Sequence, residues 1–291
     1  MNSRDLSDLE LARHLAELSD EISMARFQAI DLRVETKPDL TPVSDADQAI
    51  EEMIRNELST ARPQDQIVGE EFGSGDRSGR HWVIDPIDGT KNFVRGVPVW
   101  ATLIALMNGE EVLAGVVSAP ALYRRWYASK GSGAFLELTR SSGVPAGNKP
   151  QSQSRSQSQS QSQHVRRLQV SAVSQIADAS LSISSFASPT TGNRNDGWGA
   201  LHPNLLTLAE SVWRTRAYGD FWSHMLVAEG AIDCALEPQL ALWDMAALAI
   251  ILTEAGGRFT DFRGIDGPNG GNAISSNGLL HNSLLEFFPT P

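Results

Sequence analysis

Residues 81–93 read HWVIDPIDGTKNF, and the rest of the chain is organised around this stretch. Its first half is a continuous apolar run, Trp82 to Ile84, of residue types that favour a buried strand. A proline and a glycine then predict a sharp turn, because proline fixes φ and glycine adopts backbone angles closed to other residues. The strand and its turn therefore hold two carboxylates, Asp85 and Asp88, three residues apart at one rigid corner.

The corner has the donor set of a site for a hard cation. Asp85 and Asp88 supply carboxylate oxygens, and the Thr90 hydroxyl follows two residues later. Carboxylates without cysteine or histidine beside them suit a divalent cation such as Mg²⁺. An Asx turn, in which aspartates bond their own backbone, explains the five residues from Asp85 equally well when they are taken alone. Two further acidic positions favour the metal.

Those positions, Glu70 and Asp244, also have two interpretations each. Glu70 and Glu71 follow a short predicted strand over residues 66–69, where adjacent acids repel each other unless a cation lies near; a solvated loop is the alternative. Asp244 lies in the first turn of an apolar helix predicted over 243–255. There a carboxylate caps free N–H groups or interacts with the helix dipole.

Length and charge narrow the class of protein. A chain of 291 residues predicts two domains, or one large domain with two lobes. The net charge of −11 argues against nucleic-acid binding, which needs a basic surface, but allows a phosphate substrate if cations supply the positive charge. The N-terminus is polar, and no apolar run approaches the about 20 residues of a membrane span. We therefore expect a cytoplasmic protein without a membrane partner.

The order of the expected elements divides the chain in three. Residues 1–139 hold two amphipathic helices, the central stretch and four closely linked strands that predict an antiparallel meander, which is an α+β pattern. Residues 168–291 alternate strands and helices, an α/β pattern. Between them, residues 140–167 contain an almost pure Ser/Gln tract, and we expect a disordered surface insertion there.

Two motifs together resemble the signatures of the inositol monophosphatase family of Mg²⁺-dependent phosphatases. The first is Asp85-Pro-Ile-Asp-Gly-Thr90, extended through Asn92-Phe93; the second is Trp243-Asp-Met-Ala-Ala247, followed by Glu254-Ala-Gly-Gly257. The resemblance runs from about residue 11 to residue 285. It implies the layered αβαβα sandwich of sugar phosphatases, with the metals between two lobes, and a homodimer, which is common in the family.

The resemblance also implies a role for each matching residue. Two or three Mg²⁺ ions would be bound by the carboxylates of Glu70, Asp85, Asp88 and Asp244 and by the carbonyl of Ile87. Thr90 would orient and help deprotonate the attacking water, Asp47 would accept a hydrogen bond from Thr90, and Glu70 is the third catalytic residue. Backbone N–H groups at Gly89 and Thr90 would hold phosphate oxygens.

The expected substrate follows from two acids near the second motif. Residues 216–221, Arg-Ala-Tyr-Gly-Asp-Phe, are similar to the histidinol-phosphatase branch found in actinobacteria. Asp220 and Glu237 suit a cationic leaving group better than a neutral polyol. Arg216 assists the substrate, braces Glu237, or forms an ion pair between the lobes. The residues expected to bind histidinol phosphate are Asp88, Gly89, Thr90, Arg216, Asp220, Glu237 and Asp244.

Two other functions stay open. Lys91 also follows Asp-Gly-Thr in phosphatases of 3′-phosphoadenosine 5′-phosphate, so that activity or a broader inositol monophosphatase activity is the first alternative. A metal-binding protein without turnover is the second, and the presence of both Thr90 and Asp47 argues against it.

Overall fold

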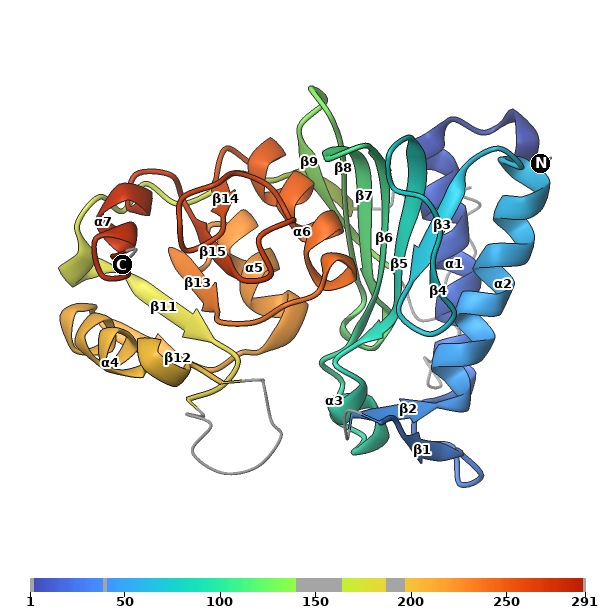
Figure 1. Ribbon diagram of the computed structural model, residues 1–291, viewed down its shortest axis with the longest axis horizontal. Helices are drawn as coiled ribbons and strands as arrows, with labels where there is room; N and C mark the ends of the chain where they lie inside the picture. Colours follow the sequence, from blue (N-terminus) through green and yellow to red (C-terminus); the bar gives the residue numbers. More distant parts are fainter. Residues whose placement is uncertain (1–2, 39–40, 140–163, 187–196, 290–291) are drawn as a thin grey trace, which may run out of the picture.

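The computed structural model describes residues 3–38, 41–139, 164–186 and 197–289. They fold into five layers, helix–sheet–helix–sheet–helix, which Figure 1 shows edge-on. The outer helices on the first sheet are α1 (Asp8–Arg26) and α2 (Asp45–Ala61), the middle layer holds α5 (Asp220–Ala228) and α6 (Leu242–Glu254), and the second sheet is covered by α4 (His202–Ser211) and α7 (His281–Leu285). The expected αβαβα sandwich is confirmed.

The first sheet has eight strands in the order β10-β9-β8-β7-β6-β5-β3-β4. Their bounds are β3 (Gln66–Gly69), β4 (Gly73–Ser74), β5 (Arg80–Asp88), β6 (Ala101–Asn108), β7 (Glu111–Ala119), β8 (Arg124–Ser129), β9 (Ala134–Leu138) and β10 (His164–Arg167). Strands β6 to β9 form the expected antiparallel meander. Strand β3 runs parallel to β5, so Glu70, which follows β3, and Asp85 and Asp88, which lie in the last part of β5, are at the same end of the two strands.

The prediction that a disordered insertion extends to residue 167 is wrong for its last four residues. Residues 140–163 lie outside the described part of the chain, but His164–Arg167 form β10, which pairs antiparallel with β9. An edge strand needs no apolar alternation, so its polar sequence gave no strand signal. The division of the chain at residues 139 and 168 stays a prediction.

The second sheet has five strands in the order β12-β11-β13-β15-β14. Their bounds are β11 (Ser180–Ile183), β12 (Arg214–Arg216), β13 (Cys234–Glu237), β14 (Arg258–Thr260) and β15 (Ala273–Ser276). The remaining elements are the hairpin β1 (Val34–Thr36) and β2 (Pro42–Ser44), the short helix α3 (Thr90–Val94), and the 3-10 turns η1 (Ser3–Asp5), η2 (Pro120–Leu122), η3 (Ile176–Asp178) and η4 (Gly199–Leu201).

Three apolar clusters hold the layers together. Strand β5 shows how: Trp82 and Ile84 pack in the cluster with α1 and α2, and Val83 packs on the other face with α6. Successive side chains of a strand point to opposite faces, so a continuous apolar run is buried on both sides. A third cluster joins the second sheet to α4 and α7. Within the described residues, no helix combines the length and hydropathy that a membrane crossing requires.

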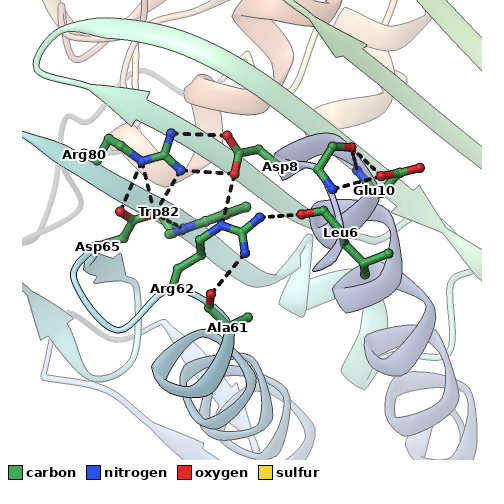
Figure 2. Close-up of polar contacts among 9 residues, drawn as sticks. Leu6, Asp8, Glu10, Ala61, Arg62, Asp65, Arg80 and Trp82 are labelled. Carbon is green, nitrogen blue, oxygen red and sulfur yellow. Dashed lines mark hydrogen bonds and ion pairs between the residues drawn. The ribbon is translucent and has the colours of Figure 1, made fainter. Parts of the chain in front are cut away.

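Ion pairs fix the first helix to the start of β5 (Figure 2). Asp8 accepts from both Arg62 and Arg80 at 3.1 Å, and Arg80 also pairs with Asp65 at 3.1 Å. The Asp65 carboxylate accepts a hydrogen bond from the indole nitrogen of the fully buried Trp82 at 3.0 Å. This polar cluster therefore anchors the start of a nine-residue strand whose other end bears the aspartates.

Candidate active site

The end of β5 forms the expected corner. The pairing of β5 with β6 shifts register between Asp85 and Asp88, and Gly89 follows with a φ of 84° before α3 begins at Thr90. A Cβ at Gly89 would lie 3.0 Å from the carbonyl oxygen of Val99, so both the backbone angle and the space require glycine. The corner turns the two carboxylates and the threonine toward the same region.

Three aspartates from two parts of the chain meet at this corner. Asp85, Asp88 and Asp244 each offer one carboxylate oxygen, and these oxygens lie within 4.8 Å of one another. Asp244 also caps α6, because it accepts a hydrogen bond from Ala241 N at 2.7 Å. Asp88 accepts one from Phe221 N at 2.8 Å. Asp244 therefore caps its helix and also lies close to the other two aspartates, so the cap does not exclude a role as a metal ligand.

Burial and mutual repulsion raise the pKa values of this cluster. Burial is the largest cause for Asp85, and the charges of Glu70, Asp88 and Asp244 add to it. Burial and then the charge of Asp220 raise the pKa of Asp88, while burial and then Glu70 raise that of Asp244 to about 7. One oxygen of Asp85, Oδ1, is buried without a hydrogen-bond partner among the described residues. The three carboxylates supply oxygen donors and concentrate negative charge, and both properties fit a hard divalent cation.

Glu70 directly follows β3, near the aspartate cluster, and is held by a lysine. Lys37 Nζ donates to Glu70 Oε1 at 2.7 Å and to Glu71 Oε1 at 2.6 Å. The charge of Glu70 raises the pKa values of Asp85 and Asp244, although its oxygens are not part of the three-aspartate group. Lys37 is thus the positive group that two adjacent acids require, and no local sequence pattern marks it.

Thr90 and Asp47 meet although 43 residues separate them. The Thr90 hydroxyl lies 3.2 Å from Asp47 Oδ1 and 2.9 Å from the carbonyl oxygen of Ile87. Asp47 is fully buried, and its other oxygen accepts from the backbone N and hydroxyl of Ser44 in the capping box at the start of α2. Burial raises the pKa of Asp47. The structure therefore brings together the hydroxyl and the carboxylate that the sequence paired.

A cavity of about 560 Å³ lies beside the aspartates. The titratable residues that line it are Asp88, Lys91, Tyr218, Asp220, His224, Glu237 and Asp244. Glu237 ends β13 and is 3% exposed; Ser184 donates to its Oε2, and burial raises its pKa to about 8. Asp220 begins α5 and accepts from Asn92 at 3.2 Å. The cavity thus joins the three-aspartate cluster to two further acids, the buried Glu237 and the partly buried Asp220.

Arg216 is not brought to this cavity. It is the last residue of β12, an edge strand of the second sheet, and its side chain is exposed. The guanidinium donates to the carbonyl oxygen of Thr215 at 2.8 Å, and Arg216 is not among the described residues that line the cavity.

Sequence reasoning missed three polar residues here. Asn92 lies inside the first motif, and its contact with Asp220 required knowledge of a pairing across 128 residues. Lys37 and His224 gave no signal, because a lone lysine in a loop and a lone histidine in an apolar helix are ordinary features. Only the fold places them beside the acids.

Comparison with known proteins defines the family. The inositol monophosphatase family model matches residues 6–289. The histidinol-phosphatase of Streptomyces coelicolor is 52% identical over 97% of both chains, and that of Mycobacterium tuberculosis is 50% identical over 96% of both. The solved Thermotoga maritima IMPase superposes with a TM-score of 0.77 at 29% identity, over 97% of both chains. The chain therefore belongs to the inositol monophosphatase family, whose members are metal-dependent, and is a phosphoric monoester hydrolase.

Proposed function

We propose that this protein hydrolyses L-histidinol phosphate to L-histidinol and phosphate, with Mg²⁺, in histidine biosynthesis. The observation that carries the proposal is a pair of acids, the buried Glu237 and the partly buried Asp220, that line the cavity beside the aspartate cluster. Two relatives with 50% identity or more have the name histidinol-phosphatase, which supports the same substrate.

The metal site is assigned to the acids at the corner of β5. The carboxylates of Glu70, Asp85, Asp88 and Asp244, with the carbonyl of Ile87, would hold two or three Mg²⁺ ions. Bound there, Mg²⁺ would offset the charge of the phosphate dianion and lower the pKa of a water molecule. The buried, unpaired Oδ1 of Asp85 supports the assignment, since within the described residues nothing else satisfies it.

Thr90 and Asp47 would remove the proton from the attacking water. The Thr90 hydroxyl would accept a hydrogen bond from the water while it donates its own proton to Asp47, 3.2 Å away, instead of to the carbonyl of Ile87. The raised pKa of Asp47 favours acceptance of that proton, and Ser44 holds the carboxylate in place. Glu70 would help to orient the water. Backbone N–H groups of Gly89 and Thr90, at the start of α3, would bind the phosphate oxygens.

Asp220 and Glu237 would bind the leaving group. Histidinol has an amine and an imidazole, either of which offers N–H donors and a positive charge to these carboxylates. Inositol offers no charge, so it would give the buried Glu237 no cationic partner. The acids therefore favour a cationic alcohol over a neutral polyol.

Phosphate release with Mg²⁺ from histidinol phosphate, inositol 1-phosphate and 3′-phosphoadenosine 5′-phosphate tests the proposal. We expect kcat/KM to be at least about 30-fold higher for histidinol phosphate, the ratio that about 2 kcal/mol gives for one lost buried charge partner. A preference for either other ester would replace the substrate but keep the phosphatase chemistry. Release from none would favour a metal-binding protein without turnover.

We also infer a homodimer from the family resemblance, and light scattering on the purified protein tests that inference. A cytoplasmic location stays a prediction.

A further inference from the structure

His224 lines the same cavity and has no part in the proposed chemistry. The residue is 1% exposed, and its Nδ1 is hydrogen-bonded to the hydroxyl of Ser275. Its Nε2 is also buried but has no partner in the described part of the chain. A buried polar atom left unpaired is unfavourable, so its presence beside a cavity points to a ligand that pairs with it.

The strand register places the His224 ring on the same side of the second sheet as Glu237. Ser275 on β15 pairs with Ala235 on β13, and Glu237 lies two residues after Ala235. Side chains two residues apart point to the same face, so Ser275 and Glu237 are diagonal neighbours on the face that α5 covers. Like His224 Nε2, the Oε1 atom of Glu237 is buried without a hydrogen-bond partner among the described residues.

Helix α5 adds a third group to this side of the cavity. Asp220 and His224 are four residues apart in the helix, which puts them on one face, and both line the cavity. Burial lowers the pKa of His224 to about 4, so its ring is neutral near pH 7 and does not neutralise Asp220 or Glu237. A neutral ring keeps one nitrogen as a hydrogen-bond acceptor, which a ligand in the cavity can use.

We propose that His224 is a specificity-determining residue, whose Nε2 accepts a hydrogen bond from an N–H of the leaving group while Glu237 binds beside it. The Nδ1–H donates to Ser275 in the tautomer that leaves Nε2 as an acceptor. This inference rests on the proposed function, because it assumes a leaving group with an imidazole or an amine. It adds a neutral acceptor, oriented by Ser275, to the two acids.

Two substitutions separate recognition by Nε2 from the bond to Ser275. An asparagine amide reaches about as far as Nδ1, and a glutamine amide about as far as Nε2. In His224→Asn, kcat/KM for histidinol phosphate should fall about 10-fold or more, as expected for a lost hydrogen bond to a charged donor; His224→Gln should stay within about threefold of wild type. With p-nitrophenyl phosphate, whose leaving group has no N–H, both variants should stay within about threefold of wild type.

Product inhibition keeps this test independent of the substrate assignment. L-Histidinol should inhibit p-nitrophenyl phosphate hydrolysis by the wild type, and about 10-fold more weakly in His224→Asn, whichever ester is hydrolysed best. Equal inhibition of the wild type and His224→Asn would overturn the inference alone. A parallel loss with both substrates, together with a lower melting temperature, would also overturn it by showing that His224 acts only in packing. Poor hydrolysis of histidinol phosphate by the wild type would instead overturn the proposed function.

Discussion

The carboxylate of Glu51 fills the space that a side chain at Gly69 would need. A Cβ at Gly69 would lie 2.0 Å from Glu51 Oε1. Glu51 is fully buried in α2, and its two oxygens accept the backbone N–H groups of Glu71 and Phe72 at 2.8 and 3.2 Å. The buried Glu51 carboxylate therefore fixes the turn that positions Glu70.

Loosening this turn should weaken Mg²⁺ binding. In Glu51→Gln we expect the Mg²⁺ concentration for half-maximal activity to rise about 10-fold, the usual size of an effect on a residue that supports a metal ligand, with kcat at saturating Mg²⁺ little changed. Gly69→Ala should raise it further, because the methyl group displaces the carboxylate. Mg²⁺ titrations of phosphate release measure both. Glu52→Gln, at the exposed next position of the helix, is the matched control. Titration curves that coincide with wild type would show that other contacts hold Glu70.

Thr90 gives a direct test of the proton path. Removal of its hydroxyl breaks the link to Asp47, so Thr90→Ala should lower kcat by about 10²–10⁴, the usual contribution of a general base. Thr90→Ser keeps the hydroxyl and should retain most of the activity. Both should keep the Mg²⁺-dependent rise in melting temperature, since the proposed carboxylate ligands are unchanged. A Thr90→Ala variant with wild-type kcat would exclude this path.

The parts of the site that are local in sequence could be predicted from it. The corner of β5 depends on a proline and a glycine within four residues, and the capping box of α2 depends on Ser44 and Asp47. The meander follows from short connections between strands. In each case one short segment contains both the cause and the result.

The parts of the site that depend on residues far apart in the chain could not be predicted from the sequence. Lys37 lies 33 residues before Glu70, and no pattern marks it as the counter-ion. Gly69 ends a strand as expected, but glycine is required there because the Glu51 carboxylate of the preceding helix occupies the space of a side chain. Arg216 was expected to assist the substrate, brace Glu237 or form an ion pair between the lobes. In the structure it ends the edge strand β12 with an exposed side chain and is not among the described residues that line the cavity.

Mg²⁺ should stabilise the folded protein through the aspartate cluster. At a concentration 100 times its dissociation constant, a ligand that binds only the native state adds about 2.7 kcal/mol to the free energy of unfolding. Asp88→Asn should abolish both turnover and the Mg²⁺-dependent rise in melting temperature. Thermal unfolding with Mg²⁺ and with EDTA measures the effect. An active Asp88→Asn enzyme would rule out its role as a metal ligand.

Glu237 should make the metal-free protein less stable as pH rises. Burial raises its pKa from 4.5 to about 8, so between these values the folded state keeps a proton that the unfolded state releases. The free energy of unfolding therefore falls with pH across this window, by at most about 1.4 kcal/mol per pH unit for one group. Glu237→Gln removes this dependence, so its stability relative to wild type should increase from pH 5 to pH 8. Urea unfolding in EDTA at pH 5 and pH 8 measures the difference in free energy of unfolding between Glu237→Gln and wild type. Both proteins contain the same aspartates, so the titration of these groups cancels in the difference. A constant difference would show that Glu237 does not titrate in this window.

Asp65 should matter for stability but not for metal binding. Its carboxylate satisfies both Arg80 and the indole N–H of Trp82 at the far end of β5 from the aspartates (Figure 2). Asp65→Ala leaves a buried N–H unpaired and removes one partner of a half-buried arginine, so we expect a loss of about 2–4 kcal/mol. Asp65→Asn keeps an acceptor for the indole and should lose less.

Asp31→Asn, in an exposed pair with Arg26, should change stability by less than about 1 kcal/mol and is the control. Urea unfolding gives these values, and the Mg²⁺ titration should be the same in all three variants. A changed titration in Asp65→Asn would mean that the strand transmits strain from this ion-pair cluster to the corner of the active site.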